Sequence, residues 1–262
     1  MNINTLQQIE EDIKEFLDKE LKEGEFFFNE CEFQVKLALF LKEKKNYEVF
    51  LEYTVPLDAK IIQAKIREWK KSGRVPPFSN NKEKIDIDIV IKKDGLFYPI
   101  ELKYRTTKIK GLYKRFGVPI DDSQLLKDQG AVPRGRHDFW KDVARLEFIR
   151  RCFGKIVGGL CVFLTNDKRY TEEATGTSQD FTMEKEKLHT NLLRFRTDGL
   201  IKRNPKFSLL GEYRIKEWYC CSNIGNKGID FQYCIVKISQ NNLSNHYRKK
   251  VKTHCRIYNK TT

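Results

Sequence analysis

The segment KIDIDIVIKKDGLFYPIELKY (84–104) alternates apolar and polar side chains on both sides of Asp94-Gly95. An Asp-Gly pair between such alternating stretches is the strongest short-range signal for a two-residue β-turn. The segment therefore predicts a β-hairpin with one apolar face. That face carries four cross-strand pairs: Ile91 with Tyr98, Ile89 with Ile100, Ile87 with Leu102 and Ile85 with Tyr104.

The opposite face of the predicted hairpin carries charge. The same register places Asp88 opposite Glu101 and Asp86 opposite Lys103. Directly opposed residues have Cβ atoms about 4.5–5.5 Å apart, and like charges in that position destabilise a sheet. A cation between the two carboxylates would remove this repulsion. Mg²⁺ prefers oxygen ligands and usually takes one or two carboxylates from a protein.

Two other interpretations of the hairpin stay open. In the first, the charged face is solvated and Asp86 forms a cross-strand ion pair with Lys103, because antiparallel strands commonly alternate apolar and polar residues. In the second, a loop of about three to five residues replaces the tight turn. A one-residue change of register would then move every side chain to the other face.

An acid early in one strand, followed by Glu-x-Lys in the next, resembles the PD-(D/E)xK nuclease superfamily. Asp88 matches the first acid, and Glu101-Leu102-Lys103 matches the (D/E)xK tripeptide, whereas Ile87 stands where the family name has proline. The resemblance covers about residues 25–170. It implies a restriction-endonuclease-like α/β fold, in which helices flank a mixed β-sheet core.

The same resemblance implies a metal-dependent endonuclease that hydrolyses DNA phosphodiester bonds, of a restriction or defence type. Asp88, Glu101 and the Leu102 carbonyl would hold Mg²⁺, for which Mn²⁺ would substitute. Lys103 would orient or help to deprotonate the attacking water. Two other functions stay open: a structure-specific or repair nuclease, and a basic nucleic-acid-binding module whose carboxylates have no catalytic role.

Glu30 is a fourth candidate catalytic residue. The sequence predicts a helix that begins near Asn29, with Glu32 as its capping-box residue. At 100° per residue, Glu30 falls within the apolar stripe of this helix, and Gln34 follows one turn later. PD-(D/E)xK nucleases often carry an additional active-site glutamate on the helix before the sheet. The alternative is that Glu30 only complements the positive N-terminus of its helix.

We divide the chain into an N-terminal helical segment (1–24), a nuclease-like core (25–170) and a C-terminal extension with a basic tail (171–262). Periodicity and turn residues predict the remaining elements: helices over 5–22, 58–71 (an insertion), 138–153 and 181–195, strands over 47–55 and 156–164, and a C-terminal hairpin of 213–222 with 231–239. Glu147 lies on the apolar side of its helix, where it would form either a structural ion pair or an outer contact of the metal site.

A long connection over 105–135 is basic and contains aromatic residues. Such a pattern suits phosphate contacts and base stacking, although a solvated run of charge has the same composition. The connection supplies five candidate nucleic-acid-binding residues: Arg105, Lys108, Lys110, Lys114 and Arg115.

Charge and composition agree with a nucleic-acid partner. The 262 residues include 50 Lys and Arg against 36 Asp and Glu, which gives a formal net charge of +14. Such an excess indicates a polyanionic partner, and we expect duplex DNA. No apolar run approaches the roughly 18–20 residues that span a membrane, so we expect no membrane partner. The polar N-terminus and the absence of CxxC pairs predict a cytoplasmic protein. A homodimer stays open.

Overall fold

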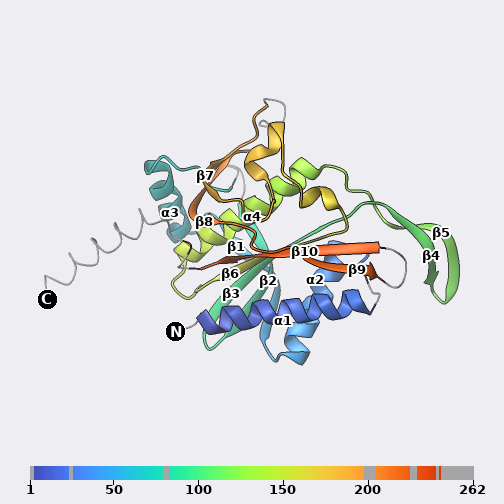
Figure 1. Ribbon diagram of the computed structural model, residues 1–262. Coiled ribbons are helices and arrows are strands. Elements are labelled where there is room, and N and C mark those ends of the chain that lie inside the picture. Colours follow the sequence, from blue (N-terminus) through green and yellow to red (C-terminus); the bar gives the residue numbers. More distant parts are fainter. Residues whose placement is uncertain are drawn as a thin grey trace, which may run out of the picture.

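The computed structural model describes residues 3–23, 26–78, 83–197, 204–224, 229–239 and 242. Within them, a six-stranded sheet with the order β1-β2-β3-β6-β10-β9 forms the centre of the molecule (Figure 1). Its strands are β1 (Glu48–Pro56), β2 (Lys84–Lys93), β3 (Leu96–Arg105), β6 (Gly159–Thr165), β9 (Tyr219–Ile224) and β10 (Ile229–Ile238). Because β3 and β6 run parallel and the other neighbours antiparallel, the predicted mixed sheet of an α/β protein is confirmed.

Helices cover both faces of this sheet (Figure 1). Helices α1 (Ile3–Lys22) and α2 (Glu30–Leu39) lie on one face, and α4 (Val132–Cys152) lies on the other with α3 (Lys60–Lys71) beside it. A π-helical turn, η1 (Phe40–Lys44), continues α2. The helix predicted over 5–22 is α1, and its apolar residues are buried: Leu6, Ile9, Ile13, Phe16, Leu17 and Leu21. Each face of the sheet thus has its own core, the usual result when amphipathic helices pack on a sheet.

The predicted turn and the first part of its register are confirmed. Asp94 and Gly95 both have positive φ, 52° and 73°, as a type I′ turn requires. Pairing between β2 and β3 runs from Lys93–Leu96 to Ile89–Ile100. The two strands do not pair beyond that point, so four predicted pairs are wrong: Asp88 with Glu101, Asp86 with Lys103, Ile87 with Leu102 and Ile85 with Tyr104.

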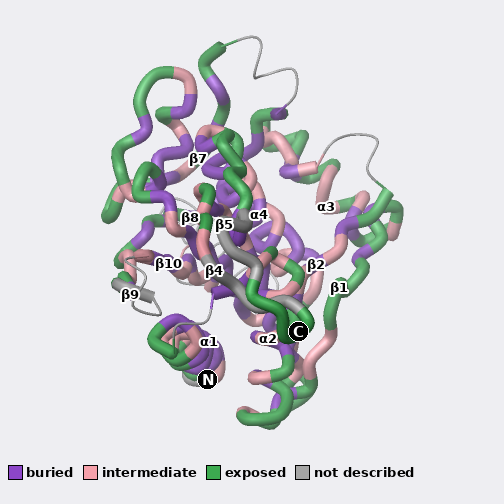
Figure 2. Tube along the Cα trace, turned by 90° about the vertical axis from the view of Figure 1, so that its right-hand side faces the viewer, coloured by how far each residue is buried: buried purple, intermediate pink, exposed green. Residues whose placement is uncertain are grey.

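Strand β2 also changes its buried face near Asp88. Ile89 and Ile91 pack in the core beside α1 and α2, whereas Ile85 and Ile87 pack in the core beside α4. The prediction of one continuous apolar face is therefore wrong, although all four isoleucines are buried. On β1, Glu52 lies opposite this point with a φ of 48°, a conformation uncommon for residues other than glycine. Strand β1 is the exposed edge of the sheet (Figure 2).

A parallel crossover links β3 to β6 through α4 and forms a βαβ unit. The predicted connection over 105–135 contains more structure than expected. Strands β4 (Ile109–Arg115) and β5 (Val118–Leu126) form an antiparallel hairpin that projects from the body of the molecule (Figure 1), and α4 begins at Val132. We call this hairpin the arm.

The C-terminal part adds strands to the sheet. The predicted hairpin is confirmed as β9 and β10, and β10 pairs with β6. The helix predicted over 181–195 is wrong: short 3₁₀ helices η2 (Lys168–Tyr170) and η3 (Gly176–Phe181) precede β7 (His189–Leu193), which pairs with β8 (Phe207–Tyr213). The basic tail lies outside the described residues.

Candidate active site

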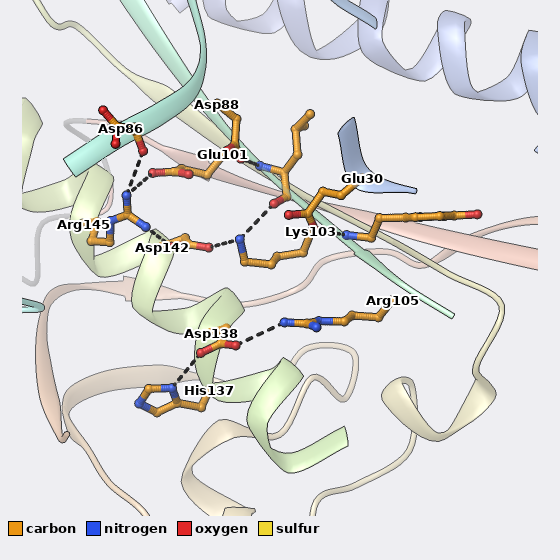
Figure 3. A network of polar contacts seen from close by, with 12 residues as sticks. Glu30, Asp86, Asp88, Glu101, Lys103, Arg105, His137, Asp138, Asp142 and Arg145 are labelled. Carbon is orange, nitrogen blue, oxygen red and sulfur yellow. Dashed lines mark hydrogen bonds and ion pairs between the residues drawn. The ribbon is translucent and has the colours of Figure 1, made fainter. Parts of the chain in front are cut away.

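Asp88 lies at the fork where β2 separates from β3 (Figure 3). Its Oδ2 accepts a hydrogen bond of 2.6 Å from the Leu102 backbone N–H. The Asp88 carbonyl accepts a bond of 2.7 Å from Gln34 Nε2, which also donates to Glu52 at 2.6 Å. A side chain from α2 thus ties β2 at the fork to β1, and this places Gln34 at the site as its position one turn after Glu30 predicts.

Glu101 is buried on the α4 side of β3, with 2 % of its surface exposed. Its Oε1 lies 3.2 Å from Nη2 of Arg145. The same guanidinium contacts Asp142 Oδ1 at 2.7 Å and donates to the Asp86 carbonyl at 3.0 Å. The interpretation of a solvated charged face is therefore wrong for this carboxylate, because α4 covers it.

Lys103 points toward the same helix (Figure 3). Its Nζ donates to the Leu102 carbonyl at 3.0 Å and lies 2.8 Å from Asp142 Oδ2. The alternative ion pair with Asp86 is not formed: that carboxylate instead accepts from the Thr54 hydroxyl at 2.5 Å and lies 3.4 Å from Lys84 Nζ.

Glu30 reaches the same strand from the opposite side. Its Oε2 accepts a hydrogen bond of 2.8 Å from the Tyr104 backbone N–H, one residue beyond Lys103. Asn29 caps the helix, as predicted, by accepting from the Glu32 N–H. Glu32 in turn accepts from the Phe28 N–H, one residue before the predicted partner. Among its recorded contacts, Glu30 therefore binds β3 rather than its own helix terminus.

Two residues of this site, Asp142 and Arg145, were not predicted from the sequence. They come from the buried face of α4 and connect Glu101 with Lys103. The sequence does contain a signal for Asp142. It lies three residues after Phe139 and four before Leu146, which places it on the same helix face as these apolar residues. An acid on a buried stripe requires a partner, and helical spacing could have identified it.

Glu147 belongs to a different network. Its Oε2 accepts from the Leu210 backbone N–H at 2.8 Å, and its Oε1 lies 3.5 Å from Arg151 Nη2. These contacts tie α4 to β8, and Glu147 is 1 % exposed. Of the two roles considered for it, the structural ion pair is the one observed.

Burial and neighbouring charges determine the pKa values of the carboxyl groups in the site. Burial is the main cause that raises the pKa of Asp88 to about 6, against 3.8 ordinarily, with Asp142 and Glu30 adding to it. Burial likewise raises the pKa of Glu101 well above its usual value, although Arg145 opposes the shift. The pKa of Asp142 is lowered, because Lys103 and Arg145 outweigh its burial.

At Lys103 the neighbouring charges outweigh the effect of burial on the pKa. Burial by itself lowers the pKa of the ammonium group, but the surrounding carboxylates raise it above the ordinary value. Those carboxylates belong to Asp142, Glu30, Glu101 and Asp88. The side chain is therefore a permanent cation at neutral pH in the metal-free protein.

The groups around Lys103 offer oxygen ligands to a divalent metal. Four carboxyl groups surround Lys103, and Arg145 is the second cation among them. No group of three or more His, Cys, Asp or Glu side chains in the described ranges is placed to hold a metal. Mg²⁺ needs only one or two carboxylates, so Asp88, Glu101 and the Leu102 carbonyl fit its chemistry.

The five candidate nucleic-acid-binding residues do not form one cluster. Arg105 ends β3 beside the site, where its Nη2 lies 3.1 Å from Asp138 Oδ2. Lys108 and Lys110 are exposed at the base of the arm. Lys114 and Arg115 lie near the tip of β4, but their side chains are outside the described part of the structure.

Comparisons with known proteins give no family assignment. No known protein family, curated protein or solved structure matches the chain. Among the described helices, none combines the length and apolar character required to cross a membrane.

Proposed function

We propose that this protein is a metal-dependent endonuclease that hydrolyses DNA phosphodiester bonds, with Asp88, Glu101 and Lys103 at its centre. The observation that carries the proposal is the convergence of these three residues at the fork of β2 and β3, inside a cluster of four carboxyl groups and two cations. Buried ionisable groups with shifted pKa values cluster at functional sites, so this cluster points to a function.

Asp88, Glu101 and the Leu102 carbonyl are the groups that would hold Mg²⁺ or Mn²⁺. When bound, the ion would polarise a phosphoryl oxygen and lower the pKa of a bound water. The carbonyl has two lone pairs, so it can accept from Lys103 and still have one free. A cation bound to the two acids would also favour their ionised forms, which burial, the main cause of their raised pKa values, disfavours.

Lys103 would act as a fixed cation. Its raised pKa argues against the role of general base, because the ammonium group stays protonated at neutral pH. It would instead orient the attacking water by hydrogen bonding and offset the charge that develops on the phosphate. Attack in line with the leaving oxygen would break the P–O3′ bond and leave a 5′-phosphate and a 3′-hydroxyl.

Duplex DNA is the proposed substrate and restriction-type cleavage the proposed activity, supported by the net charge of +14. A structure-specific or repair nuclease would use the same centre. The alternative from another class is a basic nucleic-acid-binding module. In that case the network of Glu101, Arg145, Asp142 and Lys103 would have only a structural role.

Calorimetric titration with Mn²⁺ or Ca²⁺ tests the metal centre. We expect one binding event in the wild-type protein that Asp88→Ala or Glu101→Ala abolishes. Glu48→Ala is the matched control, because its carboxylate is exposed on β1 and pairs only with Lys92 among the recorded contacts. Unchanged binding in both site variants would rule out this centre.

A further inference from the structure

A cleft of about 200 Å³ opens on the α4 side of the candidate site. Four cationic side chains and two carboxylates line it, with an apolar wall from the segment after α3: Lys103, Arg105, Lys141, Arg145, Asp138, Asp142, Pro77 and Phe78. Its lining therefore has more positive than negative groups. We call it the α4 cleft.

The cations of the α4 cleft differ in their partners. Lys103 and Arg145 pair with Asp142, and Arg105 pairs with Asp138. Lys141 is half-buried, yet it has no hydrogen bond or ion pair with any described residue. Burial lowers the pKa of this ammonium group and the cations of Arg145 and Lys103 add to the effect, whereas Asp142 and Asp138 oppose it. A partly desolvated cation without a partner is unfavourable, and an anionic ligand would offset that cost.

We propose that the α4 cleft is a phosphate-binding subsite, in which Lys141 and Arg105 hold a backbone phosphate of the nucleic acid. This inference rests on the proposed function and adds to it the residues that hold the substrate next to the reacting phosphate. Lys103 lines both the cleft and the candidate site, so the bound phosphate would neighbour the one that is cleaved.

The volume of the cleft is suited to one part of a long ligand rather than to a complete small molecule. Sites that enclose a small molecule measure roughly 300–1,000 Å³, whereas this cleft is smaller. A phosphate of a strand that lies across the opening would fit this description. Pro77 and Phe78 would face the sugar, and Phe78 is held in place by an edge-to-face contact with Phe148 at 5.0 Å.

Salt-dependent binding of a short labelled duplex, measured in Ca²⁺, tests the subsite. Neutralising one phosphate contact should reduce the slope of log K against log salt by about 0.9. We expect this reduction for Lys141→Ala and a slope close to wild type for Lys141→Arg. Lys155→Ala is the matched control, because Lys155 is exposed beyond the end of α4 and lies outside the cleft. Thermal melting of each variant establishes that it is folded.

Equal slopes for wild type, Lys141→Ala and Lys155→Ala would overturn the subsite and leave the nuclease proposal standing, provided that the wild type binds and cleaves DNA. Titration with inorganic phosphate separates a second source of the same ligand chemistry. Phosphate binding that depends on Lys141, with no duplex binding by the wild type, would overturn both the nucleic-acid assignment and the proposed function.

Discussion

At the scale of single residues, Lys103 determines how the candidate site can work. It lies between the Leu102 carbonyl and Asp142, and four carboxylates keep it protonated. A cation held in this way contributes most where negative charge develops during the reaction. In the proposed mechanism the lysine would therefore act in the transition state, whereas the acids would bind the metal.

Lys103→Ala should separate cleavage from binding. We expect the DNA affinity in Ca²⁺ to stay near wild type, while cleavage in Mg²⁺ falls by about 10²–10³-fold, the usual loss when one preorganised charge-stabilising group is removed. Cleavage of labelled duplex and anisotropy of the same duplex measure the two effects. Full cleavage by the variant would mean that the lysine is only the partner of Asp142.

Asp88 provides a pH-dependent test of the buried carboxyl cluster. Its pKa is about 6 in the folded protein and 3.8 ordinarily, so the folded state binds the proton more tightly. The stability contributed by the protonated form is complete below about pH 4 and is lost as the pH rises through about 6. At one pKa unit per about 1.4 kcal/mol, ionisation costs on the order of 3 kcal/mol.

Asp88→Asn should therefore stabilise the metal-free protein above about pH 7, because the amide keeps an acceptor for Leu102 and carries no charge. We expect this gain in the free energy of unfolding to decrease between about pH 6 and pH 4. Urea unfolding in EDTA over that range measures it. A gain that is the same at every pH would contradict a raised pKa.

At the scale of elements, α4 completes the site that the hairpin begins. The hairpin provides Asp88, Glu101 and Lys103, and two of these, Glu101 and Lys103, pair with Arg145 and Asp142 of α4. The parallel crossover from β3 to β6 positions this helix over the polar face of β3. Removing one member of such a buried charge network leaves the other members uncompensated, which typically costs several kcal/mol.

The arm permits a test of the basic connection. If β4 follows the DNA backbone, replacing Lys108, Lys110, Lys114 and Arg115 together should reduce the salt slope by about 0.9 for each lost phosphate contact. The affinity should fall similarly for all sequences, because phosphate contacts carry no sequence information. Salt titrations of duplex binding measure this effect.

A quadruple variant of the C-terminal tail is the control for the arm, with the same change in formal charge: Arg248, Lys249, Lys250 and Lys252. An equal fall of the slope in both variants would indicate general electrostatics rather than a specific surface on the arm. An unchanged slope in both would leave the net charge of the chain without a role in DNA binding.

At the scale of the whole molecule, local signals predicted the elements better than their pairing. The Asp94-Gly95 turn fixed the register near the loop, and helical periodicity located α1 and α2. The separation of β2 from β3 at Asp88 could not be predicted, because it depends on packing against α4 and on the bond from Gln34.

The arm and the β7–β8 pair were missed for related reasons. The arm is polar and contains Gly111, so its sequence resembles a loop. In 181–195 the apolar residues also fit a helical spacing, but β7 pairs with a strand more than ten residues later in the chain. Local periodicity carries no information about which distant strand a segment pairs with.

The central claim is that Asp88, Glu101 and Lys103 form a metal-dependent nuclease centre, and cleavage of supercoiled plasmid tests it most directly. The wild type should cut the plasmid in Mg²⁺ or Mn²⁺ and not in EDTA. Glu101→Gln should lose at least about a hundredfold in rate, whereas Glu48→Gln, at an exposed carboxylate of β1, should cut as wild type does. Cleavage by Glu101→Gln at the wild-type rate, or no metal-dependent cleavage by the folded wild type, would contradict the claim.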